Sequence, residues 1–379
     1  MKLFTKQFFV ILLMSMSAFA HAQVPSIPPN GGNQKSTVRQ YMGAVTYVEV
    51  SYSSPDVAGR EGQIWGTLVP YGRNNLGFGI SSEENPSPWR AGANENTTIT
   101  FSHDMLFLGT DVKAGTYGLH LVPSAEQDWE VILSYESNAW GSFFHKTTDE
   151  AYVMKASPEE APFTEFLTYE FSNRLVDKTT LSLIWENLKL PMTIEVPNQN
   201  EITLAAVESD LKNSVGFNHL NWSTAALWAS GAGFHEKAKQ WAEMAITAPF
   251  VGQRDFTTLS SKAAVLLNAG ESSAAQEVMD EAIKLEGATA FQIHAYGRQL
   301  IGAGMPEKAL EVFKYNQKRF KGAWPTNYGL ARGYSASGDF KNAVKYMELA
   351  IKNVPEGDLV NPPIMKTNLE KLKKGEDIN

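Results

Sequence analysis

The side chains best suited to chemistry lie in one short stretch, from Trp89 to Glu95. Trp89 offers an indole face, Arg90 a guanidinium, Asn94 an amide and Glu95 a carboxylate. A guanidinium can bind a carboxylate or phosphate through two parallel hydrogen bonds, and an indole can pack against a sugar or another flat ring. The stretch therefore predicts a pocket for a small polar or carbohydrate ligand. The alternative is architectural: Arg90 pairs with Glu95, Asn94 sits in a turn and Trp89 packs inside.

Two histidines could add acid–base chemistry to this pocket. His103 follows the strand expected after Glu95, and His120 lies in a later strand. If these strands bring a histidine beside Glu95, the group could act as the acid and base of a hydrolase. The alternative is that both are ordinary histidines of strand surfaces. The chain has no cysteine and no His-x-His or His-Glu-x-x-His spacing, so neither a metal nor another cofactor is predicted.

The elements expected to position these residues are short strands. Between about residues 38 and 197, β-branched and aromatic residues recur in short segments separated by turn residues, with no helical period between them. This pattern predicts an antiparallel β-sandwich or barrel-like domain. Residues 74–88 read as a long surface loop that leads into Trp89. The expected strands are 44–52, 63–69, 97–102, 116–122, 130–135, 151–155, 166–171, 180–186 and 192–196.

Several short motifs of this domain occur in an order typical of a known family. They are Val69-Pro70-Tyr71-Gly72, Trp89-Arg90-Ala91-Gly92-Ala93-Asn94-Glu95, Ala114-Gly115-Thr116-Tyr117-Gly118-Leu119, Ala161-Pro162-Phe163-Thr164-Glu165 and Trp185-Glu186-Asn187. Over about 40–197 the sequence resembles the bacterial domain of unknown function 2911 family. Many relatives join Tyr-Gly to Trp-Arg after two or three residues, whereas Arg73 to Pro88 intervene here. The resemblance supports the β fold and export, and implies no particular activity.

A helical repeat follows the β domain. Gly233, Gly270, Gly304 and Gly338 recur at intervals of 37, 34 and 34 residues, and an alanine follows each of them five residues later. The interval, with small residues where helices would cross, resembles tetratricopeptide repeats. We expect a connecting helix over 198–218, about four helical hairpins over 219–357 and a capping helix and tail over 358–379. Asn316 replaces a repeated alanine, so we expect the third hairpin to be the weakest.

A stacked array of hairpins presents a concave groove, which typically binds a protein or peptide. The alternative is a pedestal that supports or dimerises the β domain. Residues expected on first helices, and hence in the groove, are Tyr296, Arg298, Asn327, Tyr328 and Arg332, although the same positions could be solvated or part of the core.

The N-terminus indicates export. Residues 1–22 carry Lys2 and Lys6, a short apolar run and Ala20-His21-Ala22, which together read as a signal peptide cleaved near Ala22-Gln23. Residues 23–37 read as a flexible lead-in. We therefore expect a periplasmic or secreted chain with no membrane span after cleavage. The net charge of −8 argues against binding nucleic acid.

The sequence thus predicts an α+β protein of two domains, an N-terminal antiparallel β domain and a C-terminal α-solenoid of tetratricopeptide-like hairpins. Three functions stay open: a cell-envelope binding protein with a ligand site and a protein-interaction repeat, an envelope hydrolase that uses Glu95 and a histidine, and a purely structural scaffold.

Overall fold

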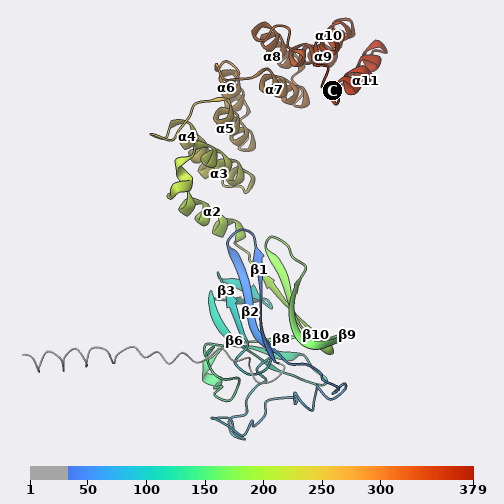
Figure 1. Ribbon diagram of the computed structural model, residues 1–379. Helices are drawn as coiled ribbons and strands as arrows, with labels where there is room; N and C mark the ends of the chain where they lie inside the picture. The colour runs from blue at the N-terminus through green and yellow to red at the C-terminus, as the bar shows by residue number, and fades with distance from the viewer. Residues whose placement is uncertain (1–32) are drawn as a thin grey trace, which may run out of the picture. The chain divides into compact units, whose positions relative to one another are not determined.

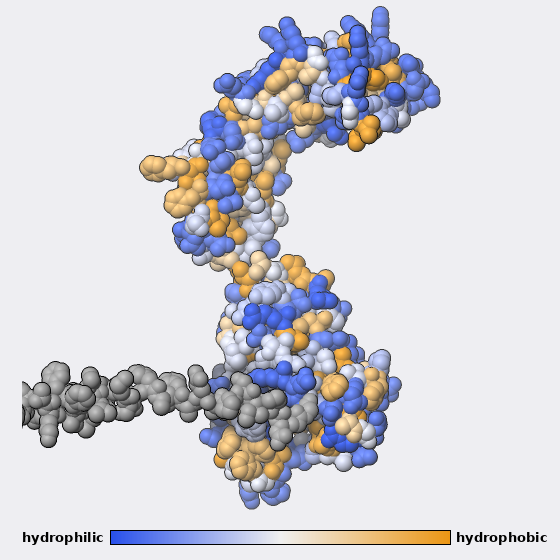
Figure 2. Space-filling model, in the orientation of Figure 1, coloured by the Kyte–Doolittle hydropathy of each residue, from blue (hydrophilic) through white to orange (hydrophobic). Residues whose placement is uncertain are grey.

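The computed structural model describes residues 33–379 and divides them into two units that meet between Ile202 and Thr203 (Figure 1). The predicted signal peptide and the lead-in up to residue 32 lie outside the described residues. The first unit contains strands and the second contains helices, as the change of sequence period predicts. Polar residues are spread over the visible face of both units, with smaller apolar areas between them (Figure 2).

Two antiparallel sheets build the first unit. The larger has the order β1-β2-β3-β6-β7-β8 and the smaller the order β5-β4-β10-β9. Residues of both sheets contribute to one hydrophobic core, in which Trp129, Trp185 and Phe101 are among the largest fully buried side chains. The strands are β1 (Gln34–Met42), β2 (Thr46–Ser54), β3 (Thr98–Phe101), β4 (Met105–Phe107), β5 (Thr110–Val112), β6 (Gly115–Val122), β7 (Trp129–Ser134), β8 (Glu150–Ala156), β9 (Glu159–Ser172) and β10 (Lys178–Glu195).

The first strand lies partly where a flexible lead-in was expected. β1 begins at Gln34 and pairs with β2 in unbroken register, from Gln34 opposite Ser54 to Met42 opposite Thr46. Most of its side chains are polar, and five of the nine are exposed, as is common for an edge strand. A polar edge strand lacks the alternating apolar pattern on which strand prediction depends, so residues 34–42 did not read as a strand.

Other strand predictions also need correction. Residues 63–69 form turns rather than a strand, because Gly62 and Gly66 adopt positive φ and Val69 bonds back to Ile64 and Gly66. The predicted strands 180–186 and 192–196 are parts of one strand, β10, which ends at Glu195 and whose pairing with β9 shifts at Glu186 rather than ending there. The three-residue strands β4 and β5 are too short to show a period in the sequence.

The helices form the predicted hairpins. Gly233, Gly270, Gly304 and Gly338 all lie at the turns with positive φ, so each reverses the chain where a side chain would be strained. The helices are α2 (Gln199–Asp210), α3 (His219–Gly231), α4 (His235–Thr247), α5 (Phe256–Asn268), α6 (Ser272–Ala282), α7 (Ala290–Gly302), α8 (Pro306–Arg319), α9 (Trp324–Ala336), α10 (Phe340–Asn353) and α11 (Asn361–Lys373), with short 3₁₀ turns η1 (Thr147–Asp149) and η2 (Ser214–Phe217). Among residues 33–379, none of these helices combines the length and apolar character needed to cross a membrane.

Asn316 has a specific contact in the third hairpin. It is fully buried, and its amide donates a 2.8 Å hydrogen bond to the carbonyl oxygen of Ala290 at the start of α7. At the position where the other hairpins have alanine, Asn316 therefore links α8 to α7 through a hydrogen bond. The hydrogen bond gives the buried amide nitrogen of Asn316 a partner.

Candidate functional site

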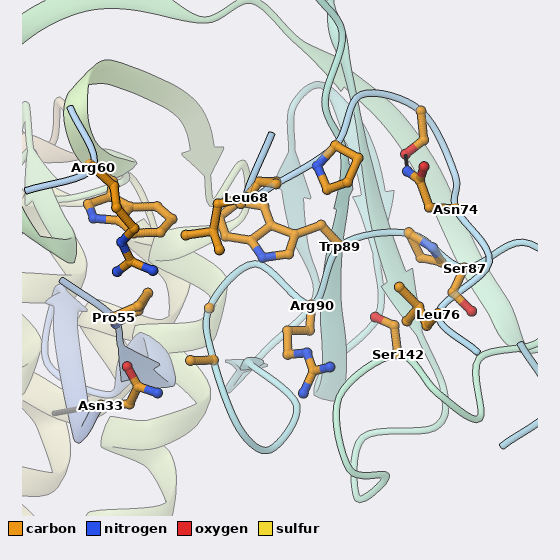
Figure 3. Close-up of a pocket in the computed structure, with 17 residues that line it drawn as sticks. Asn33, Pro55, Arg60, Leu68, Asn74, Leu76, Ser87, Trp89, Arg90 and Ser142 are labelled. Atoms are coloured by element: carbon orange, nitrogen blue, oxygen red, sulfur yellow. Dashed lines mark hydrogen bonds between the residues drawn. The ribbon is translucent and has the colours of Figure 1, made fainter. Parts of the chain in front are cut away.

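A cavity of about 340 Å³ opens beside Trp89 and Arg90 in the β unit (Figure 3). Its volume lies at the small end of the range for ligand pockets. The wall combines apolar side chains with two guanidinium groups and several amide or hydroxyl groups. Its lining residues include Arg60, Leu68, Pro70, Asn74, Leu76, Ser87, Pro88, Trp89, Arg90, Ser142 and Trp185.

Trp89 is held in the wall by its backbone and its ring. Its N–H and C=O both bond to Leu121 of β6 at 2.8 Å. Its ring lies nearly parallel to that of Trp185, with centroids 6.2 Å apart, and meets the edge of Trp65 at 5.7 Å. Aromatic pairs favour such offset and edge-on arrangements. Trp89 is only half-buried, so part of its ring stays available to the cavity.

An irregularity in β10 places Trp185. The next residue, Glu186, has φ of 53° at the point where the pairing of β10 with β9 shifts. Its buried carboxylate accepts the backbone N–H of Gly62, which holds this conformation in place. Bulges commonly re-aim a neighbouring side chain. Here the bulge lies directly after Trp185, whose indole lines the cavity from the smaller sheet.

The loop after Trp89 fixes Arg90. Ala91 and Asn94 have φ of 54° and 56°, an unusual conformation for residues other than glycine. The Ala91 carbonyl accepts bonds from Thr97 Oγ1 at 3.1 Å and the Tyr169 hydroxyl at 2.9 Å, which stabilises the turn. The Asn94 carbonyl accepts a 2.6 Å bond from Nη1 of Arg90. The turn thus holds the guanidinium at a set position.

No carboxylate pairs with Arg90 among residues 33–379, and burial alone lowers the pKa of its guanidinium below the ordinary value. The guanidinium lies over the Phe143 ring, 4.7 Å from its centroid. A Cβ atom on Gly141 would lie 2.3 Å from Cζ of Arg90, so only glycine leaves room for it. The pair between Arg90 and Glu95 that the architectural alternative requires is therefore not formed.

A second guanidinium lines the same cavity. Arg60 Nε donates to the Val57 carbonyl at 2.8 Å, and Nη2 donates to the carbonyl and the carboxylate of Asp56 at 2.8 and 3.3 Å. In Figure 3, Arg60 and Arg90 lie on either side of Leu68, and both side chains extend to the same side of the Trp89 ring. Within the described part of the chain, neither aspartate nor glutamate lines this cavity.

The other residues predicted for the site lie elsewhere. Glu95 accepts a 3.2 Å bond from the Ser53 hydroxyl, and Asn94 contributes its backbone to the loop. His103 bonds through Nδ1 to Ser102 at 2.9 Å. None of these three side chains lines the cavity. The structure therefore brings Trp89 and Arg90 to the cavity and leaves Glu95 and His103 outside it.

His120 lies behind the cavity wall. Its Nδ1 is 2.9 Å from the hydroxyl oxygen of Ser142, which lines the cavity, and its ring contacts that of His145 with centroids 4.8 Å apart. Burial, followed by the nearby His145 and Arg90, lowers the pKa of His120 to about 3. The ring is therefore neutral near pH 7. In turn, His145 Nε2 bonds to Glu150 at 2.8 Å, and Glu150 pairs with Arg73.

Among the residues of this site that sequence reasoning missed, Arg60, Ser142 and Trp185 bring polar or aromatic groups to the wall. Trp185 and Ser142 come from segments that reach Trp89 only through long-range packing. One local feature accompanies Ser142: the preceding residue, Gly141, has no side chain and so leaves space for the Arg90 guanidinium. Residues 33–379 contain no group of three or more histidine, aspartate or glutamate side chains placed to hold a metal ion.

A second cavity, of about 640 Å³, lies in the helical unit between α5, α6 and α7. Tyr296 lines it, and the buried hydroxyl of Tyr296 has no hydrogen-bond partner among the described residues. The other residues predicted for the groove do not line it. Arg298 is exposed and Asn327 is buried, while Arg332 bonds to the Tyr328 hydroxyl at 2.9 Å and to the Ile378 carbonyl at 3.2 Å.

The fold and the two cavities define a class of protein: a β unit with a small cationic cavity, joined to an α-solenoid of helical hairpins. Residues 33–194 match the model of the family described as protein of unknown function (DUF2911). This confirms the resemblance of the β unit to that family. The search of curated proteins found no match.

Solved structures similar to the C-terminal part are repeat proteins. The C-terminal part of a TPR repeat-containing protein from Cytophaga hutchinsonii is 11% identical, with 46% of this chain and 68% of that chain covered and a TM-score of 0.34. A tetratricopeptide repeat protein from Parabacteroides merdae is 14% identical, with coverage of 47% and 67% and a TM-score of 0.33. YrrB, described as a TPR protein with an unusual peptide-binding site, is 18% identical, with coverage of 46% and 84% and a TM-score of 0.30.

Proposed function

We propose that the protein is an exported binding protein of the cell envelope. Its β unit holds a small polar ligand in the cavity beside Trp89 and Arg90, and its helical hairpins hold a protein or peptide partner. The observation that carries the first part is a half-buried guanidinium, with no acidic partner among the described residues, beside a partly open indole ring. A charge without a partner is costly to bury, and an anionic or polar ligand would offset that cost.

The second cavity supports the second part of the proposal. Its lining is mainly apolar, with Phe256, Leu267, Met279 and Leu300 among its residues. The Tyr296 hydroxyl, which has no partner within residues 33–379, adds one polar group that a peptide carbonyl could satisfy. Such a combination suits a peptide that inserts an apolar side chain between two hairpins.

The geometry favours binding over the hydrolase alternative. Glu95, His103 and His120 share no contact, and only the partner of His120, Ser142, reaches the cavity wall. A general base works best with a pKa near the working pH, which a buried His120 with a pKa of about 3 does not have. A purely structural scaffold gives no reason for a guanidinium without an acidic partner at a cavity wall.

Thermal-shift screening of the mature chain tests the ligand site. The panel contains sugars, peptidoglycan fragments, small carboxylic acids and divalent metal salts. A ligand present at about 100 times its Kd stabilises the folded state by about 2.7 kcal/mol, which shifts the melting temperature by several degrees. We expect at least one compound to give this shift with wild type and not with Trp89→Ala.

The matched control is Trp140→Ala, which removes a largely exposed indole that does not line the cavity. This variant should respond to the compound as wild type does. If no compound stabilises wild type, or if Trp89→Ala responds fully, the β cavity is not a ligand site.

Export is tested by expression of the full chain in a Gram-negative host, followed by fractionation and N-terminal sequencing. The proposal expects a periplasmic or secreted product that begins near Gln23. An unprocessed chain that stays in the cytoplasm would refute export.

A further inference from the structure

We infer that the β cavity selects a small ring-bearing carboxylate: its anionic end lies at the guanidinium groups of Arg90 and Arg60, and its flat ring lies against Trp89. This inference rests on the proposed ligand site and specifies the class of ligand. It goes beyond the undefined polar or carbohydrate ligand that the sequence suggests.

The charge of the wall is the first argument. The whole chain has a net charge of −8, yet the described residues around this cavity include two arginines and no acidic residue. A cleft lined by charge of one sign attracts ligands of the opposite sign. An ammonium-bearing ligand would meet repulsion from Arg90, whereas a carboxylate would meet Arg90 and, across the cavity, Arg60, whose charge Asp56 partly offsets.

The open donors of Arg90 are the second argument. A guanidinium has five N–H groups, and the one side-chain bond of Arg90 within the described chain uses Nη1, which donates to Asn94. The contact with the Phe143 ring and the space above Gly141 fix the plane of the group. A guanidinium held in place with free donors is ready to bind a carboxylate bidentately without losing much side-chain entropy.

Arg60 is held in the same manner. Its Nε and Nη2 are occupied by Val57 and Asp56, which fix the guanidinium at the other side of the cavity (Figure 3). Because Asp56 offsets part of its charge, we assign the principal contact to Arg90 and a supporting electrostatic role to Arg60.

The indoles provide the third argument. Trp185 lines the cavity, and its buried Nε1–H has no partner among residues 33–379. An indole nitrogen can only donate. The indole nitrogen of Trp185 therefore adds one donor beside the two guanidinium groups, which suits a ligand with acceptor oxygens. A neutral sugar would leave the charge of Arg90 without a counter-charge, because none of the described lining residues carries a carboxylate.

The apolar part of the wall sets the body of the ligand. The half-buried Trp89 ring, Leu68, Pro70 and Pro88 surround a space of about 340 Å³. A flat ring fits an indole face well, and a volume of this size suits a compact ligand. Benzoate combines a single ring with a carboxylate and is therefore the probe of choice.

Isothermal titration of the mature chain with benzoate, benzamide and inorganic phosphate tests this inference. Benzamide keeps the ring and removes the charge, and phosphate keeps the charge and removes the ring. We expect benzoate to bind at least tenfold more tightly than either. Arg90→Gln should weaken benzoate binding by about 10- to 100-fold, the usual effect of losing a charged hydrogen bond.

Leu68 offers a pair of matched variants that should fold normally, because this residue lines the cavity and is 45% exposed. Leu68→Glu adds a negative charge at the wall and should weaken benzoate binding, whereas Leu68→Lys should preserve or strengthen it. This comparison does not depend on whether Arg90→Gln folds, which unliganded melting checks separately.

The outcomes separate the two proposals. Equal binding of benzoate and benzamide, or equal effects of the two Leu68 variants, would overturn selection for an anion while the cavity remained a ligand site. Phosphate binding as tight as benzoate would overturn the role of the ring. If none of the three probes binds but another compound of the thermal-shift panel does, the ligand class is wrong. If nothing in that panel binds, the proposed ligand site fails as well.

Discussion

Trp185→Ala is expected to lower the free energy of unfolding of the β unit by about 3–5 kcal/mol, the usual range for loss of a buried tryptophan. The side chain is 1% exposed and contacts both Trp65 and Trp89, with ring centroids 5.7 and 6.2 Å apart. The bulge at Glu186 fixes the backbone beside it, so the surroundings cannot collapse far into the space left by the ring. The site therefore needs Trp185 both as core and as the support of Trp89.

Native-state hydrogen exchange read by mass spectrometry measures this effect, because it reports the opening free energy of each unit in the same chain. The strands of the β unit should lose protection while the hairpin helices keep theirs. Trp140→Ala is the matched control: Trp140 is 54% exposed, so its loss should change stability by no more than about 0.5 kcal/mol. A cost for Trp185→Ala no larger than that of the control would refute this view of the core.

Phe313→Ala is expected to destabilise the helical unit by about 3–5 kcal/mol. The Phe313 ring is fully buried on α8, and three glycines on α7 and α9 face it. A Cβ atom on Gly297, Gly329 or Gly333 would lie 2.4, 2.5 or 2.9 Å from the nearest ring atom. Three helices thus approach one another around this single ring. Because the facing residues are glycines, they have no side chain to fill the space when the ring is removed.

Phe250→Ala is the matched control, since Phe250 is fully exposed and alanine accepts its positive φ about as well as phenylalanine does. Exchange in α7, α8 and α9 should accelerate in Phe313→Ala and stay unchanged in Phe250→Ala. Because each hairpin is stabilised mainly by its neighbours, the α3–α4 hairpin should be least affected. Uniform loss of protection across all four hairpins would contradict this local role of Phe313.

The helical unit could be predicted closely because its signals are local. Glycines that need positive φ and alanines at helix crossings repeat at nearly constant spacing, so Gly233 to Gly338 mark the turns directly. The β unit was predicted less well. β1 is a polar edge strand, and Gly62 and Gly66 turn residues 63–69 although these look β-rich. The spacing of apolar side chains alone reveals neither a polar edge strand nor turns that glycines impose.

The cavity could be predicted only in part. Trp89 and Arg90 are neighbours in sequence, so their shared site is visible in the chain. Trp185 reaches them through the pairing of distant strands, and Arg60 through turns just before residues 63–69. Glu95 looked equally suitable, but the loop directs its carboxylate to Ser53 instead. Which side of a loop a residue faces depends on long-range contacts that a single sequence does not contain.

The most direct test of the ligand site is a crystal structure of the mature chain grown with the compound that stabilises it most. We expect the compound to lie in the β cavity, with its ring against Trp89 and an oxygen within hydrogen-bond distance of the Arg90 guanidinium. A compound bound elsewhere, with the guanidinium of Arg90 paired to a carboxylate of the chain itself, would contradict it.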